Sequence, residues 1–80
     1  MNGPLIKLQR QRLGLTQEDV ATELQRVTGR SVDRSTVAGW ETGRAYPDPR
    51  LLLPLADLLE TTTDKLLKVD GGVKAQATGP

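Results

Sequence analysis

The chain has 80 residues, with 11 lysines and arginines against 10 aspartates and glutamates, and a formal net charge of +1. This length allows one domain with a modest core, and a charge so close to zero excludes the strongly basic class of proteins that coat DNA without regard to sequence. Cysteine and histidine are both absent, which excludes disulfides, thiol chemistry and an ordinary zinc site, so we expect neither a metal nor a cofactor.

The composition also bears on cellular location and on catalysis. No apolar run approaches the roughly 18 residues that a membrane span requires, and no charged-then-apolar leader is present, so we expect a cytoplasmic protein that does not contact a membrane. Without histidine or cysteine, catalysis would depend on paired carboxylates, but the acids are scattered over expected helix starts and outer faces. We therefore expect no enzymatic activity.

The first predicted helix follows a short lead of residues 1–4, in which Pro4 is acceptable at a helix start. The helix runs to about Leu13 and ends at Gly14. Apolar residues recur along it at helical spacing. Four of them are expected to form its inward face: Leu5, Ile6, Leu8 and Leu13.

The second predicted helix begins after Thr16, whose hydroxyl forms a capping-box pattern with Asp19 three residues later. Its end is expected near Thr28, with Gly29 as the terminator. The apolar residues expected on its inward face are Val20, Ala21, Leu24 and Val27.

The stretch from Asp33 to Gly43 predicts a short third helix that could lie in a groove of DNA. Asp33 is a good N-cap, and Gly43 suits the left-handed position just past a helix end. Val37 and Trp40 are its only large apolar residues, and their i, i+3 spacing gives one narrow buried stripe. Trp40 is therefore assigned to the core rather than to stacking on bases. The outward side chains are short apart from Arg34, so the helix backbone can approach another surface closely.

Asp48 followed by Pro49 marks the start of a fourth, leucine-rich helix. Pro54 falls beyond its first turn, so either the helix proper starts later, after a tight turn at 49–52, or it bends at this proline. The expected inward stripe is Leu52, Leu55, Ala56 and Leu59.

Thr61–Thr63 break the fourth helix and offer a cap for a short fifth helix that contains Leu66 and Leu67. The glycine-rich residues 70–80 cannot bury enough apolar surface to order themselves, which predicts a flexible tail. Its composition fits a linker or a tag-like remnant better than a strand that contacts a dimer partner. The predicted fold is all-α, a compact bundle of five short helices in a single domain over residues 1–69.

Several elements occur in a common order and at matching separations. They are Arg10, the string Leu13-Gly14-Leu15-Thr16-Gln17, Val20-Ala21, the string Val37-x-x-Trp40-Glu41-x-Gly43, Pro47, Leu55-Ala56 and Asp64-x-Leu66-Leu67. Together they make about residues 5–68 resemble the Cro/lambda-repressor-like (Xre-type) helix-turn-helix family of bacterial and phage regulators. The resemblance implies a compact five-helix domain whose second and third helices form the DNA-binding pair, with the third helix in the major groove.

The resemblance also implies roles for individual residues. Five of them would face base edges: Asp33, Arg34, Ser35, Ala38 and Gly39. Four others would contact the DNA backbone, namely Gln17, Thr42, Arg44 and Arg50, and Gln17 would also brace the third helix. Arg30 joins this candidate backbone set from outside the family pattern. Arg10 and Glu41 would form a buried ion pair that ties the first helix to the end of the third, although the sequence alone would place both charges on the surface.

One segment departs from the family pattern. Gln25–Val32 is about six residues longer than the tight linker of a helix-turn-helix, and we expect an extra turn or more on the second helix followed by a short loop. Arg26 and Arg30 in this segment either add phosphate contacts or only solvate it. Glu60 stands where a glycine would be expected to close the fourth helix.

Arg34 is the leading candidate for reading a base, because arginine bidentate to guanine is the commonest specific contact. A helix start also mildly disfavours a cation unless a phosphate or base arrives. Gly39 is open to two interpretations, a close approach to DNA or a tolerated weak point of the helix. Tyr46 either touches a sugar-phosphate oxygen or fills its loop.

These features favour a sequence-specific regulator, a repressor associated with the nucleoid, that binds double-stranded DNA as a homodimer on a palindromic operator. Leu53 and Leu58 are candidates for the dimer surface. The alternative is a protein-interaction module on the same scaffold, such as an antitoxin or adaptor whose helices bind a partner protein. The modest net charge favours this alternative, whereas the use of arginine for every cation from Arg26 to Arg50 opposes it.

Overall fold

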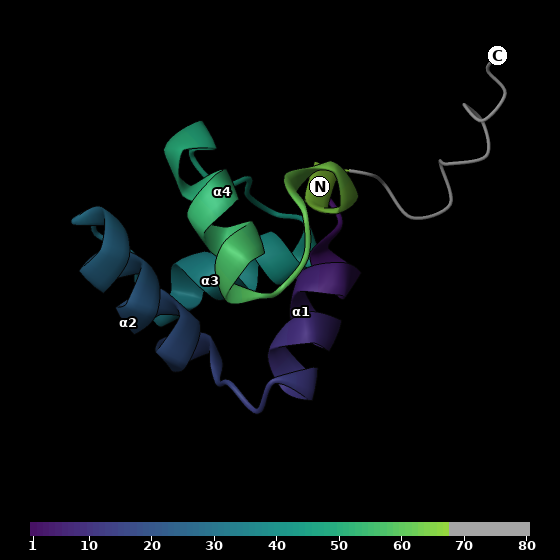
Figure 1. Ribbon diagram of the computed structural model, residues 1–80, viewed down its shortest axis with the longest axis horizontal. Coiled ribbons are helices and arrows are strands. Elements are labelled where there is room, and N and C mark those ends of the chain that lie inside the picture. Colours follow the sequence, from purple (N-terminus) through teal and green to yellow (C-terminus); the bar gives the residue numbers. More distant parts are fainter. Residues whose placement is uncertain (68–80) are drawn as a thin grey trace, which may run out of the picture.

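The computed structural model describes residues 1–67, and within them it is entirely helical (Figure 1). The helices are α1 (Gly3–Arg12), α2 (Gln17–Thr28), α3 (Arg34–Thr42), α4 (Pro49–Leu58) and α5 (Thr63–Leu67). The predicted all-α fold of five short helices is confirmed. The tail expected over residues 70–80 lies outside the described residues. None of the described helices has the length and apolar character that crossing a membrane requires.

The core forms where α3 packs against both α1 and α2, while α4 covers α2 and α5 joins α1 to α4 (Figure 1). Val37 and Trp40 of α3 are buried at its centre, with 0% and 1% of their surface exposed. The remaining core is aliphatic: Ile6, Val20, Ala21, Leu24, Val32, Leu51, Leu55, Ala56, Leu59 and Leu66. Val37 and Trp40 form the expected narrow stripe of α3.

The helix starts follow the predicted caps. Thr16 Oγ1 accepts from the Asp19 amide at 3.0 Å while the Asp19 carboxylate accepts from the Thr16 amide at 2.8 Å, which completes the capping box. Asp33 caps α3 and Asp48 caps α4. Gly43 ends α3 with φ 81°, the left-handed conformation in which glycine escapes the cost of a Cβ atom.

Helix α4 begins at Pro49 and continues through Pro54, so the interpretation in which the helix proper starts later is wrong. Its first turn is tight, because the Leu51 amide bonds the Asp48 carbonyl at 2.7 Å. Leu51 rather than Leu52 occupies the innermost position, with 6% of its surface exposed, whereas Leu52 is half-buried. The apolar pattern therefore placed this end of the stripe one residue too late.

Three apolar residues that were expected to face inward lie on the surface. Leu8 is 50% exposed, Leu13 36% and Val27 55%. In α1 the inward face continues from Ile6 into Gln9, whose Nε2 donates to the Leu59 carbonyl at 2.9 Å. Val27 lines a hollow between α2 and α4 instead of the closed core. In the fifth helix Leu66 is buried, but Leu67 is exposed.

The first residues of the chain are part of the fold rather than a lead. Asn2 caps α1 through its side chain, and its amide bonds the Leu66 carbonyl at 2.6 Å, which joins the start of α1 to α5. Gly3 is buried against the end of α3: a Cβ atom built on it would lie 2.3 Å from the Glu41 carbonyl oxygen. Only glycine allows the two helices to approach this closely.

Glu60 adopts φ 57°, and it is the one non-glycine residue with positive φ among the described residues. Its amide bonds the Asp57 carbonyl at 3.1 Å, and the Thr61 amide bonds the Ala56 carbonyl at 2.9 Å. These two bonds form the Schellman motif that glycine usually closes. The expectation of a glycine at this position was therefore physically correct, and the glutamate bears the conformational cost.

Candidate nucleic-acid interface

Helix α3 presents to solvent the residues that were predicted to read bases. Asp33, Arg34 and Ser35 at its start are exposed, and Ala38 and Gly39 one turn later are half-buried. All five lie off the buried stripe of the helix. The sequence therefore folds α3 with one short anchor and an accessible outer face, as a groove-binding helix requires.

Asp33 acts first as the cap of α3. Its Oδ1 accepts from the Thr36 amide, the Thr36 hydroxyl and the Ser35 hydroxyl, each at 2.9 Å. The backbone bond from Thr36, followed by the hydroxyl bonds, lowers the pKa of the Asp33 carboxyl below its usual value. A charged carboxylate is thus fixed beside Arg34 at the start of the helix.

The Arg34 side chain has no ion-pair partner within residues 1–67. The ion pairs recorded there are Arg10–Glu41 and Glu23–Arg26, the second between exposed side chains. Arginine offers five donors in a planar fork that matches guanine or phosphate. An exposed, unpaired arginine at the first position of α3 is therefore available for such an acceptor.

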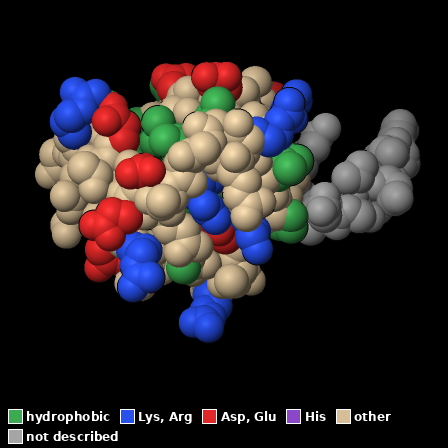
Figure 2. Space-filling view, turned by 90° about the horizontal axis from the view of Figure 1, so that it is seen from below, with side chains coloured by type: hydrophobic (Ala, Val, Ile, Leu, Met, Phe, Trp, Pro, Cys, Tyr) green, Lys and Arg blue, Asp and Glu red, His purple; other side chains and the backbone are tan. Residues whose placement is uncertain are grey.

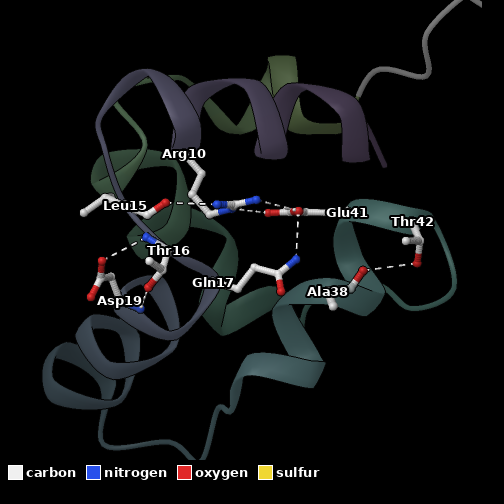
Figure 3. Close-up of polar contacts among 8 residues, drawn as sticks. All are labelled: Arg10, Leu15, Thr16, Gln17, Asp19, Ala38, Glu41 and Thr42. Carbon is white, nitrogen blue, oxygen red and sulfur yellow. Dashed lines mark hydrogen bonds and ion pairs between the residues drawn. The ribbon is translucent and has the colours of Figure 1, made fainter.

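The end of α3 is held by a polar network that joins three helices (Figure 3). Arg10 of α1 pairs with Glu41 of α3 through Nε to Oε2 at 2.6 Å and Nη2 to Oε1 at 3.2 Å, and its Nη1 donates to the Leu15 carbonyl at 2.9 Å. Gln17 at the start of α2 donates through Nε2 to Glu41 Oε1 at 3.1 Å. Only 11% of the Arg10 side chain and 4% of the Glu41 side chain are exposed. Glu41 is thus the common acceptor that fixes α3 against both neighbouring helices.

The residues assigned to the DNA backbone do not form one cluster. Gln17 contacts α3 through Glu41, and the Thr42 hydroxyl bonds the Ala38 carbonyl at 3.1 Å within α3 (Figure 3). Arg44 is exposed directly after α3, and Arg50 is exposed in the first turn of α4. Arg30 lines a separate hollow beside the start of α4, so its position differs from that of the others.

A polar hollow of about 390 Å³ lies between α2 and the start of α3. It is lined by Asp33, Arg34 and Ser35 of the predicted set and by three residues that the sequence reasoning missed, Glu18, Thr22 and Gln25. Their spacing of four and three residues places them on one face of α2. That spacing of polar residues beside buried Ala21, which lines the same hollow, was the signal that could have found them.

Charge on the face drawn in Figure 2 is mixed. Lysine and arginine side chains stand apart from one another, with acidic groups between them, and they form no continuous basic patch on that face. This distribution agrees with the net charge of +1. On this face, attraction for phosphates would come from individually placed cations rather than from a broad positive field.

The long connection between α2 and α3 has the expected form. Helix α2 extends to Thr28, and residues 29–33 form a short non-helical segment before α3. The departure from the tight linker is therefore accommodated by a longer second helix and a loop, while the order of the two helices and their packing against each other are kept.

Comparison with known proteins agrees with this arrangement. No curated protein and no solved structure matches the chain. A family model described as helix-turn-helix matches residues 6–66, which include all of α2, α3 and α4 and the Arg10–Glu41 pair. The chain therefore belongs to the Cro/lambda-repressor-like (Xre-type) helix-turn-helix family of DNA-binding regulators.

Proposed function

We propose that the protein is a sequence-specific transcriptional repressor that inserts α3 into the major groove of an operator. The observation that carries this proposal is the position of Arg34, exposed and without an ion-pair partner in residues 1–67, at the start of a helix whose opposite face is anchored by Val37 and Trp40. The major groove of B-DNA is about 12 Å wide and admits one α-helix. Ser35, Ala38 and Gly39 then face the base edges beside Arg34.

The proposed backbone contacts come from α3 itself and from the segments before and after it in the chain. Gln17 lies at the start of α2, where free amides attract a phosphate, and Arg44 and Arg50 follow α3 in the chain. Thr42 and Arg30 complete this set. Phosphate contacts of this kind fix the register of the protein on the duplex and make its affinity fall with salt.

A single helix of this length reads few base pairs, so the proposal includes a homodimer on a palindromic operator with half-sites about one helical turn apart. Leu53 on α4 is 62% exposed and Leu58 is half-buried, and both are candidates for the dimer contact. The site of action of such a repressor is the nucleoid in the cytoplasm.

The test begins with selection of bound sites from a random oligonucleotide pool, which yields the motif, its symmetry and its spacing together. Arg34→Ala should then flatten the preference for the selected site by about 1–3 kcal/mol at one base pair. Arg44→Ala is the matched control, because loss of a phosphate contact weakens all sequences alike and reduces the salt slope by about 1. An Arg34→Ala variant with unchanged sequence preference would contradict the assignment.

A second candidate function is protein binding on the same scaffold, as in an antitoxin or adaptor. It is supported by a largely apolar hollow between α2 and α4, in which Val27 and Leu53 remain exposed beside Pro54 and Leu58. A gel shift on random duplex at low salt separates the two candidates. A DNA-binding regulator retards the duplex under these conditions, and a module that binds only protein leaves it free.

A further inference from the structure

The connection between α2 and α3 contains hydrogen bonds that no apolar pattern predicts. Gln25 Oε1 accepts from the Val32 amide at 3.2 Å, across seven residues. Thr28 Oγ1 accepts from the Arg30 amide at 3.1 Å and donates to the Leu24 carbonyl at 2.7 Å. Two amides of a segment without regular structure are therefore satisfied by side chains from the last turn of α2, where a mobile loop would leave them to water.

Both ends of the same segment are also fixed. Gly29 adopts φ 73° and its amide bonds the Gln25 carbonyl at 2.8 Å, which directs the chain away from α2. Val32 is only 3% exposed and belongs to the core. The next residue, Asp33, is already the cap of α3. No free residue separates the buried anchor from the start of the helix.

We propose that Gln25 and Thr28 form a clamp that sets the orientation of α3 relative to α2, and that Gln25 is a positioning residue for the reading of DNA by Arg34. This inference rests on the proposed function. A connection about six residues longer than the usual turn would by itself allow the start of α3 to shift. The clamp replaces the missing short turn and fixes the first residues of α3, where base contacts demand the closest geometry.

The clamp acts on sequence discrimination rather than on general affinity. Contacts to base edges depend on the exact placement of a side chain, whereas phosphate contacts position the protein and carry no direct sequence information. A loosened α3 start should therefore reduce binding to the preferred site and leave binding to random duplex nearly unchanged. A direct contact between Gln25 and the DNA backbone would instead weaken both complexes to the same extent.

Two variants and one control test the clamp. Gln25→Met keeps the length of the side chain and removes the acceptor, and Thr28→Val keeps the shape and removes the hydroxyl. Thr61→Val is the control, because Thr61 follows α4 and does not line the hollow between α2 and α3, and its side chain makes no hydrogen bond within residues 1–67. Amide hydrogen exchange at Val32 and Arg30 reports the state of the clamp, and fluorescence anisotropy measures affinity for the selected duplex and for random duplex of equal length.

We expect faster exchange at Val32 in Gln25→Met and at Arg30 in Thr28→Val. The ratio of selected-site to random affinity should fall about tenfold in each, comparable to the loss of one good base contact, while random affinity changes by less than about twofold. Thr61→Val should match the unmodified protein in every measurement. Should Gln25→Met fail to fold, Thr28→Val provides the same comparison.

An unchanged affinity ratio together with faster exchange would overturn the inference, as would an equal loss on both duplexes. If the proposed function itself is wrong, the result is different, because the unmodified protein then binds neither duplex. In that case exchange alone decides the clamp: unchanged protection of Val32 in Gln25→Met overturns it, and faster exchange supports it.

Discussion

Replacement of Arg10 by methionine is expected to destabilise the fold far more than the same change at Arg12. The Arg10 guanidinium makes two bonds to Glu41, at 2.6 and 3.2 Å, and a third to the Leu15 carbonyl at 2.9 Å. Methionine keeps the aliphatic length but supplies no donor. The Glu41 carboxylate, 4% exposed, is left with the Gln17 amide at 3.1 Å as its remaining side-chain partner among the described residues.

The size of the effect follows from this burial. Removal of one partner of a buried ion pair costs about 3–5 kcal/mol, because the other charge remains desolvated and uncompensated. A domain of this length has a free energy of unfolding of roughly 4–12 kcal/mol at about 0.05–0.15 kcal/mol per residue. Arg10→Met therefore removes a large share of the stability. Arg12, whose exposed side chain has only a 3.4 Å contact with Gln9, should change it by less than about 0.5 kcal/mol.

Urea denaturation followed by the fluorescence of Trp40, the single tryptophan of the chain, measures both variants. The double variant Arg10→Met/Glu41→Gln gives an internal check, since it removes the orphaned charge and should recover part of the loss. Equal midpoints for Arg10→Met and Arg12→Met would refute the reasoning. So would a double variant less stable than Arg10→Met.

Three substitutions that remove or introduce a glycine give further predictions. Gly39→Ala should raise the free energy of unfolding by about 0.5–1 kcal/mol, since the added Cβ meets only the Ala45 Cβ at 3.5 Å. The same variant should weaken DNA binding in an anisotropy assay. An unchanged affinity would show that Gly39 is only a tolerated weak point of the helix. Glu60→Gly should stabilise by about 0.5–1 kcal/mol in chemical denaturation, because it relieves the φ 57° conformation. Gly3→Ala should lower the stability by about 1–3 kcal/mol, since its Cβ would lie 2.3 Å from the Glu41 carbonyl oxygen; a thermal melt equal to that of the unmodified protein would contradict this.

Helix boundaries were predictable because they depend on chemistry within a few residues. Thr16, Asp33 and Asp48 each accept a bond from an amide two or three residues ahead. Gly29 and Gly43 adopt φ 73° and 81° at the helix ends where the sequence placed them. A cap acts on its own helix, so its signal is complete before any tertiary contact is known.

Burial was predicted less well, because hydrophobic periodicity assumes that the inward face of a helix is apolar. In α1 that face ends in Gln9 and Arg10. Gln9 bonds a buried carbonyl after α4, and Arg10 bonds a buried carboxylate on α3. The apolar pattern assigned Leu8 and Leu13 to the core instead, and both are exposed. Hydrogen-bond partners 50 and 31 residues away cannot be inferred from spacing along one helix.

The same distinction between local signals and distant contacts applies to the candidate site. The exposure of Arg34 follows from the cap before it and the two-residue apolar stripe after it, both of which are local. The contact of Gln17 with Glu41, 24 residues apart, was accessible only through the family resemblance. The bond from the Val32 amide to Gln25 Oε1 had no signal of either kind, because the family pattern has no counterpart for this longer connection.

The apolar core by itself cannot fix how α3 faces the outside. Val37 and Trp40 form a stripe of two residues. Such a stripe resists separation of the helix from the core better than it resists rotation of the helix about its own axis. Polar contacts supply the missing restraint: the Glu41 network holds the C-terminal end, and the bond from the Val32 amide to Gln25 Oε1 on α2 holds the segment just before the N-terminal end. A perturbation of either end should therefore disturb the direction of the α3 side chains before the core itself unfolds. Stability and recognition are coupled in this domain through a few hydrogen bonds rather than through the bulk of the buried surface.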